Sequence, residues 1–344
     1  VLFTASQYFS PIILRDIIES PQVYDATADY LHWRTYGIFF SFLCVMFRAY
    51  YVGITQTKIL TINSVVMLLS NVVLNYCLIF GKGGFPVMGI AGAAIASSVS
   101  EAVSLLFFII YTGTTADKRK YGFRRAFTFR PHLLKGMLSI SGWTMVQSFI
   151  SVSIWFIFFL AIEHLGERPL AVTNIVRNIS ALLIMVISAF ATTAGALISN
   201  QIGAGEQRYL FRTCGMTLNL TYAILVPLLV ILCLFPEPVL RVFTDNPSLI
   251  AASINSVYVM STSTLIMAPA FILFNAVSGT GNTKAGFIME MISLTVYTAA
   301  VYYIVIRLKP DVALCWFSEH VYGIALIALA WWYLKSGKWR GKKV

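Results

Sequence analysis

The sequence predicts an all-α integral membrane protein of two pseudo-symmetric six-helix lobes, the first lacking about two and a half helices. Composition is one reason: 58% of the 344 residues are hydrophobic and only 11% are charged, whereas soluble domains carry about 25% charged residues. A second reason is a series of apolar runs of about 20 residues, the length that crosses a hydrocarbon core about 30 Å thick. A third is an internal repeat.

Nine apolar segments are long enough to be complete spans. They cover residues 35–53, 59–80, 86–112, 136–162, 170–198, 213–235, 249–278, 285–306 and 313–334. A further apolar segment, 1–14, is too short to cross a bilayer and lacks the basic start of a secretory signal. We therefore expect this segment to be the second half of a helix.

The longest polar stretch, 113–135, separates three complete spans from six. It holds seven lysine and arginine residues against one acid, Asp117. We therefore expect three parts: a first lobe at 1–112, a cytoplasmic linker at 113–135, and a second lobe at 136–344 that ends in a basic tail.

Charge asymmetry orients the spans. If the linker is cytoplasmic, alternation of the spans puts 16 basic and two acidic residues on its side, and six basic and nine acidic residues on the other. Because cytoplasmic loops carry an excess of lysine and arginine, we expect the linker and the C-terminus to lie in the cytoplasm.

The internal repeat relates an early segment to a late one. Shifting the chain by 226 residues aligns two short polar turns, 53–58 and 279–284, and places Pro21 on Pro247. Both turns fall on the same side, so the two halves share one topology, as in transporters whose halves are related by an axis along the membrane normal. The second copy has three spans before Pro247 and the first has only part of one, which predicts twelve spans in the intact protein.

The sequence does not support several other classes of protein. We assign the net charge of +11 to orienting loops and not to nucleic-acid binding, since charge alone is a weak sign of it. The five cysteines and four histidines are scattered, which indicates no disulfide framework and no metal site. No catalytic cluster is present, so we expect neither an enzyme nor a cofactor.

Several motifs occur together in the chain. They are FRAYYVGITQTK at 47–58, NVVLN at 71–75, GIAGAAIAS at 89–97, IGAGEQ at 202–207 and GTGNTK at 279–284. This set resembles the bacterial branch of the multidrug and toxic compound extrusion family. The resemblance implies two six-helix bundles around a central cavity, in an antiporter of the bacterial cytoplasmic membrane. It would export amphipathic or cationic small molecules in exchange for Na⁺ or H⁺, surrounded by lipid, and we expect a monomer.

Two asparagines of the span 59–80 form the first candidate site. Asn71 and Asn75 are four residues apart and share one helix face. In the family, a corresponding pair joins a hydroxyl of the following helix, matched here by Ser97, and an acid of the first helix to bind the coupling cation. The alternative is that these amides hold helices together by hydrogen bonds.

The second lobe departs from the family pattern. Family members with a carboxylate pair carry it on helices that here read 147–151 and 265–269, where no acid stands. Since polar groups at bilayer depth are functional candidates by default, we assign a set to cavity lining or gating: Arg177, Asn174, Asn178, Arg48, Glu101, Glu290 and Gln147. The alternatives are an ion pair of Arg177 with Glu290 or Glu319, and snorkelling or helix packing of the acids.

Two other functions compete with drug antiport. A lipid-linked oligosaccharide flippase of the same superfamily would need several basic residues along its cavity, for which only Arg48 and Arg177 are candidates. An intramembrane enzyme, from a different class, would need a catalytic cluster, and the sequence offers none.

Overall fold

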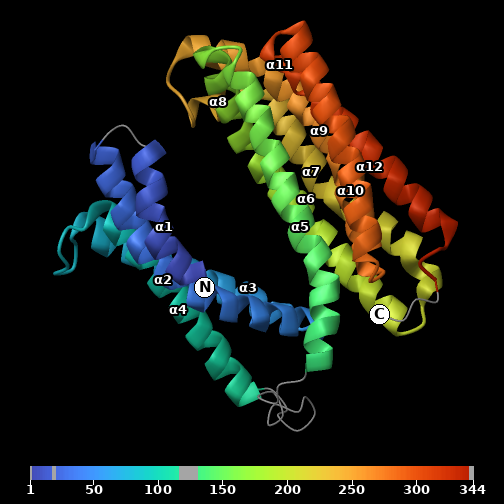
Figure 1. Cartoon of the computed structure of the whole chain (residues 1–344), viewed down its shortest axis with the longest axis horizontal. Coiled ribbons are helices and arrows are strands. Elements are labelled where there is room, and N and C mark those ends of the chain that lie inside the picture. The colour runs from blue at the N-terminus through green and yellow to red at the C-terminus, as the bar shows by residue number, and fades with distance from the viewer. Residues whose placement is uncertain (1, 18–20, 116–130, 341–344) are drawn as a thin grey trace. The chain divides into compact units, whose positions relative to one another are not determined.

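The computed structural model describes residues 2–17, 21–115 and 131–340, and the regular elements within them are all helical. The chain divides into two compact units, Val1–Phe129 and Arg130–Val344 (Figure 1). Within the described ranges, nine helices are long and apolar enough to cross a membrane. The all-α membrane fold and the nine spans predicted from composition are therefore confirmed.

Four helices make up the described part of the first unit. They are α1 (Leu2–Ile17), α2 (Pro21–Gly53), α3 (Lys58–Phe80) and α4 (Gly89–Thr115). The helix α4 packs along both α2 and α3, while α1 packs on α2. The first unit is therefore built around α4.

The buried face of α4 is made of small residues at one end and an aromatic at the other. A Cβ atom at Gly92 would lie 2.7 Å from the carbonyl oxygen of Leu78 on α3, so glycine permits this close helix approach. Towards the other end, the ring of Phe108 stacks on Phe47 and Tyr51 of α2, with centroids 5.5 and 5.9 Å apart. Tyr51 also shares a 2.8 Å hydrogen bond with Thr112.

Between residues 131 and 340, the second unit contains six long helices and several short ones. The long helices are α5 (Pro131–Glu163), α6 (Glu167–Gly203), α7 (Leu210–Leu234), α9 (Pro247–Gly279), α10 (Thr283–Val301) and α12 (Phe317–Ser336). The short ones are η2 (Gln207–Tyr209), α8 (Pro236–Arg241), α11 (Val312–Cys315) and the π-helix η3 (Tyr302–Leu308), which continues α10.

The helix α9 lies at the centre of the second unit. It packs on α6, α7 and α12, and α10 packs on both α5 and α12 (Figure 1). Pro247 occupies the first turn of α9, where its missing N–H costs nothing. The Asn246 side chain caps this helix by accepting a 3.0 Å hydrogen bond from the backbone N–H of Ser248.

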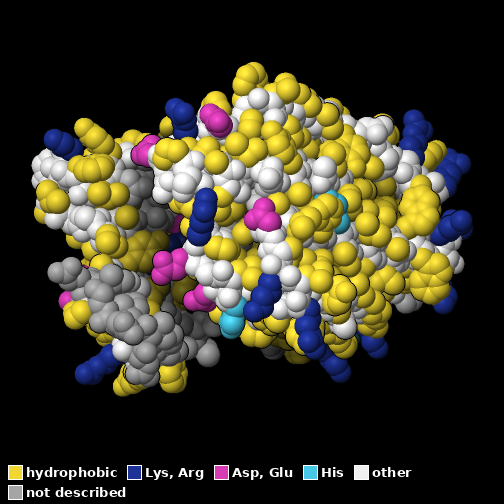
Figure 2. Space-filling model, turned by 90° about the horizontal axis from the view of Figure 1, so that it is seen from above, with side chains coloured by type: hydrophobic (Ala, Val, Ile, Leu, Met, Phe, Trp, Pro, Cys, Tyr) yellow, Lys and Arg dark blue, Asp and Glu magenta, His cyan; other side chains and the backbone are white. Residues whose placement is uncertain are grey.

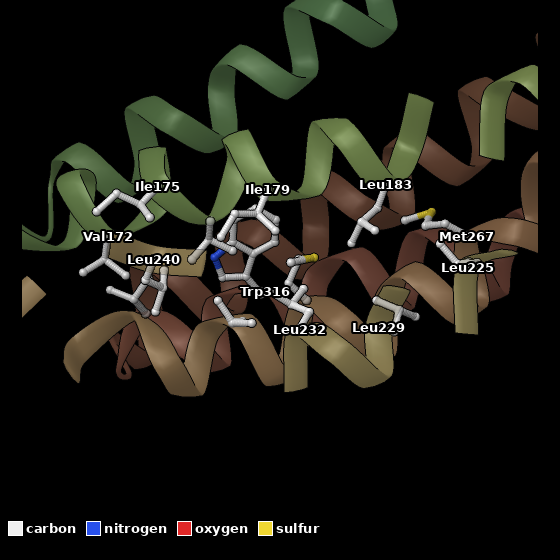
Figure 3. Packing of buried hydrophobic residues seen from close by; sticks show 14 of the residues in the cluster. Val172, Ile175, Ile179, Leu183, Leu225, Leu229, Leu232, Leu240, Met267 and Trp316 are labelled. Carbon is white, nitrogen blue, oxygen red and sulfur yellow. The ribbon is translucent and has the colours of Figure 1, made fainter. Parts of the chain in front are cut away.

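A hydrophobic core joins α6, α7 and α9. Leu225, Leu229 and Leu232 line one face of α7, and Val172, Ile175, Ile179 and Leu183 line the facing side of α6. Trp316, which is 1% exposed, lies among them (Figure 3). These positions repeat every three or four residues, as expected for one helix face.

Large apolar side chains also cover the outside of the helices, as Figure 2 shows for one face. On α3, for example, Leu68 and Leu69 are 60% and 59% exposed. In water such a surface would be unstable, whereas in a bilayer it contacts lipid chains. An exposed apolar surface of this kind is what membrane spans present to lipid.

The helices extend beyond the segments predicted from hydropathy. The largest difference is α2, which begins at Pro21 although its apolar segment begins at 35. At about 1.5 Å per residue, a helix of 33 residues is about 50 Å long, which exceeds the hydrocarbon core. Hydropathy therefore identifies only the part of a helix that lies inside the hydrocarbon core of the bilayer. Most of the predicted linker, residues 116–130, lies outside the described residues.

Candidate functional site

In the first unit, the three residues predicted to form a cation site lie together between α3 and α4. The Asn71 amide donates to the Ser97 hydroxyl at 3.4 Å, and the Asn75 amide donates to the Asn71 carbonyl oxygen at 2.9 Å. The other polar atom of Asn75, Oδ1, is buried and accepts no hydrogen bond from the described residues. One amide oxygen is thus left free to accept from a ligand.

A second side-chain amide, which is more deeply buried, lies between the same two helices, α3 and α4. Asn63 of α3 is fully buried and donates to the Ser104 hydroxyl of α4 at 2.7 Å. The Sγ atom of Cys44 on α2 lies 3.5 Å from the same hydroxyl. The sequence analysis missed this cluster. Its signal was the position of Asn63 eight residues before Asn71, which places both on one side of α3.

The predicted acidic candidate of the first unit, Glu101, is paired. Glu101 of α4 accepts two hydrogen bonds from the Arg34 guanidinium of α2, at 2.6 and 3.1 Å. Arg34 was not among the predicted site residues, and it supplies the positive charge that a carboxylate at bilayer depth requires. Arg48, the predicted basic candidate of this unit, is exposed.

In the second unit, a cavity of about 750 Å³ opens among α5, α6, α9, α10 and α12. Three of the predicted residues line it: Gln147, Arg177 and Glu290. Asn174 and Asn178 are not among the lining residues, and Asn178 is exposed. Aromatic side chains make up much of the wall: Trp155, Phe156, Phe159, Phe271, Phe274, Tyr297 and Tyr322.

The carboxyl group of Glu290 is held on one side only. Its Oε1 atom accepts hydrogen bonds from the Ser151 hydroxyl of α5 and the Tyr322 hydroxyl of α12, both at 2.9 Å. Its Oε2 atom is buried and has no hydrogen-bond partner among the described residues. The side chain as a whole is 4% exposed.

A second acid lies beside the first. Glu319 of α12 is 6% exposed and lines the same cavity. Its Oε1 atom accepts a 3.1 Å hydrogen bond from the Tyr297 hydroxyl of α10. The rings of Tyr297 and Tyr322 meet edge to face, with centroids 5.9 Å apart.

Each acid is therefore bound by a phenol of the other helix. Glu290 was predicted from the sequence, whereas both tyrosines and Ser151 were not. The signal was spacing: Tyr297 follows Glu290 by seven residues and Tyr322 follows Glu319 by three, so each pair shares a helix face.

The cation of this cavity is separate from its acids. The Arg177 guanidinium lies over the ring of Phe159, 4.8 Å from its centroid. Between described side chains, the Arg34–Glu101 pair is the only salt bridge, so the alternative pairing of Arg177 with Glu290 or Glu319 is wrong. The cavity thus presents a cation, two acids and an aromatic wall as distinct elements.

Comparisons with known proteins agree with this architecture. The family model MatE matches residues 1–77 and 144–304, more than half of the chain. The chain is 26% identical over 286 residues to the "Probable multidrug resistance protein NorM" of Thermotoga maritima, covering 80% of this chain and 59% of the relative. It is 25% identical over 268 residues to the "Uncharacterized transporter YisQ" of Bacillus subtilis, covering 74% and 56%. The chain thus spans less than two thirds of the length of these relatives.

Solved structures show the same fold. A MOP superfamily transporter from Pyrococcus furiosus, described as having a binding pocket of reverse polarity, matches with a TM-score of 0.85 at 16% identity, over 97% of this chain and 76% of that one. An outward-facing multidrug resistance MATE family transporter matches with the same TM-score and identity, over 97% and 75%. On the family match, the chain belongs to the MatE family, the multidrug and toxic compound extrusion family that its motifs resemble.

Proposed function

We propose that the protein exports amphipathic organic cations across the bacterial cytoplasmic membrane in exchange for Na⁺ or H⁺. The observation that carries this proposal is the cavity of the second unit, where an unpartnered carboxyl oxygen of Glu290 lies within an aromatic wall. Relatives named as multidrug resistance proteins support drugs as the substrates.

The chemistry of the cavity suits an organic cation. Aromatic faces attract a positive charge through the ring quadrupole, more strongly when the site excludes water. A volume of about 750 Å³ lies within the range of small-molecule sites, about 300–1,000 Å³. In this proposal a flat cation contacts rings such as Phe271 and Phe274 while its charge faces Glu290.

The first unit supplies a candidate site for the coupling cation. Asn71, Asn75 and Ser97 gather two amides and a hydroxyl between α3 and α4, and Asn75 Oδ1 has no partner among the described residues. Oxygen atoms are the ligands that hard cations prefer. In this proposal these oxygens bind the ion whose gradient drives export.

The charge asymmetry of the loops supports one orientation. We place the basic tail and the 113–135 segment in the cytoplasm, following the excess of lysine and arginine on that side. The transporter acts as a monomer within lipid in this proposal, since each lobe carries its own polar site.

Efflux from proteoliposomes tests the proposal. Ethidium, an aromatic cation, serves as the probe, and an imposed Na⁺ gradient is compared with an imposed pH gradient. We expect efflux under at least one of them and none without a gradient. Ethidium movement that is equal in protein-free liposomes, or independent of both gradients, would contradict the proposal.

A further inference from the structure

We propose that Glu290 and Glu319, with Tyr322 and Tyr297, form a proton-binding site in the second unit, distinct from the amide pair of the first unit. The inference rests on the proposed transport function and names its coupling ion at this site as H⁺. It is carried by the geometry of the two acids within the cavity.

The surroundings of Glu290 match a carboxylic acid in its protonated form. Oε1 accepts two hydrogen bonds, while the buried Oε2 accepts none from the described residues. An ionised carboxylate has two equivalent oxygens that both need donors, whereas a protonated one has an accepting oxygen and a hydroxyl. Because Oε1 already accepts from two hydroxyl donors, Oε2 is the oxygen left to carry the proton.

The two tyrosines tie this acid to the second one. Glu290 and Tyr297 lie on α10, Glu319 and Tyr322 lie on α12, and the hydrogen bonds cross between the helices in both directions. A change in the charge of either acid therefore alters a contact between α10 and α12. Hydrogen-bond networks of this kind act as one unit in a medium of low dielectric constant.

No basic side chain in the described part of the chain forms a salt bridge with these acids. Arg177 of α6 stacks on Phe159 and makes no salt bridge to a described acid. The long helix α9 contains no acidic, basic or histidine residue. His320, beside Glu319 on α12, hydrogen-bonds to Thr262 at 2.9 Å. The charge of Glu290 must then be balanced by a proton or by a cation that enters the cavity.

A proton fits this position better than Na⁺. A hard metal cation takes several oxygen ligands at once. Glu290 Oε1 instead accepts from two hydroxyl groups that already donate to it, and much of the cavity wall is aromatic. A proton needs only Oε2. During exchange, the O–H bond at Oε2 breaks, the proton passes to water in the cavity, and the charge of the organic cation takes its place beside the carboxylate.

Infrared spectroscopy of the purified protein tests the site directly. The carbonyl band of protonated carboxylic acids is recorded from mildly acidic to alkaline pH, without Na⁺ and with excess Na⁺. We expect Glu290→Gln to remove one pH-dependent band, and Tyr322→Phe to shift the same band because its carbonyl oxygen loses a donor. Excess Na⁺ should leave the band unchanged.

Glu101→Gln is the matched control, since Glu101 also lies in a span but pairs with Arg34. We expect it to remove no such band. Size-exclusion chromatography shows that each variant is folded. A spectrum unchanged by Glu290→Gln, or a band that Na⁺ abolishes at constant pH, would overturn the inference.

The result separates the two proposals. If ethidium efflux responds to a gradient but Glu290 contributes no protonated-carboxyl band, the proton site fails and the transport function stands. If the band is present but no gradient drives efflux, the proton site stands and the transport function fails.

Discussion

The two units use the same helical frame for different chemistry. The helices α2 and α9 both have 33 residues, and both their ends are related by the repeat offset of 226. Continued into the next helix, the same offset sets Asn71 of α3 against Tyr297 of α10. At this position the first unit offers a neutral amide bound to a hydroxyl, and the second offers a phenol bound to a buried acid.

The two units also differ in the groups that bind their acidic side chains. In the first unit, Glu101 pairs with Arg34. In the cavity of the second unit, the acids Glu290 and Glu319 pair only with hydroxyl groups. A repeated fold therefore fixes where polar residues can meet, while the partner residues decide whether a site holds its own counter-charge or accepts one from outside.

The largest expected effect concerns helix packing at the repeated turn. A Cβ atom at Gly279 would clash with the carbonyl oxygen of Gly195 on α6, whereas a Cβ at Gly53 would meet nothing within 4 Å. We expect Gly279→Ala to lower the free energy of unfolding by about 1–3 kcal/mol, the usual cost of overpacking. Gly53→Ala should change it by less than about 0.5 kcal/mol. Thermal unfolding in detergent measures both, and equal shifts would refute this difference between the units.

The next effect concerns the ion pair of the first unit. Arg34→Ala leaves Glu101, which is 15% exposed, without its cation. Since the pair lies between a surface pair and a buried one, we expect a loss of roughly 1–2 kcal/mol in stability. Arg48→Ala, at an exposed arginine of the same helix, serves as the control and should be near neutral. Stability that is insensitive to Arg34→Ala would show that Glu101 needs no positive partner.

Removal of an amide oxygen tests the candidate cation site of the first unit. We expect Asn75→Ala to reduce gradient-driven ethidium efflux about tenfold, since an interaction with a charged group contributes about 1.5 kcal/mol. Folding should be spared because the substitution removes only one hydrogen bond within the described residues, from the Asn75 amide to Asn71 on the same helix. Ser64→Ala, at an exposed hydroxyl of α3, is the matched control. Normal transport by Asn75→Ala under both gradients would remove this residue from the site.

The smallest effect concerns a single phenol of the second unit. Tyr322→Phe keeps the ring but removes one of the two donors to Glu290 Oε1. We expect pH-gradient-driven efflux to fall about fivefold, equivalent to about 1 kcal/mol for one hydrogen bond. Tyr258→Phe, at an exposed tyrosine of α9, should leave efflux unchanged. An identical effect of both substitutions would mean that the hydroxyl of Tyr322 does not act through Glu290.

Much of the fold could be predicted from the sequence because a bilayer leaves few choices. Backbone groups in lipid must bond within the segment, so an apolar run of sufficient length is a helix. Helix ends were less predictable, as α2 shows, because hydropathy does not register a helix that continues into water. By contrast, the internal repeat relates the two helices, because both ends of α9 follow the corresponding ends of α2 by the repeat offset.

The candidate sites were predictable only in part. Asn71 and Asn75 were found because both lie in one span at helical spacing, and Ser97 through a family motif. The partners of Glu101 and Glu290 were not, because Arg34 lies 67 residues from Glu101 and Ser151 lies 139 residues from Glu290. Such contacts depend on which helices pack together, and periodicity within one helix carries no information about its neighbours.

The most direct test of the account is the effect of Glu290→Gln on ethidium efflux driven by a pH gradient in proteoliposomes. Glu237→Gln, at an exposed acid of α8, is the matched control at equal amounts of reconstituted protein. Because an amide can neither release a proton nor balance the charge of an organic cation, we predict that Glu290→Gln lowers efflux at least tenfold while Glu237→Gln leaves it unchanged. Efflux by Glu290→Gln equal to that of the unsubstituted protein would contradict the assignment of the second unit as the site of exchange.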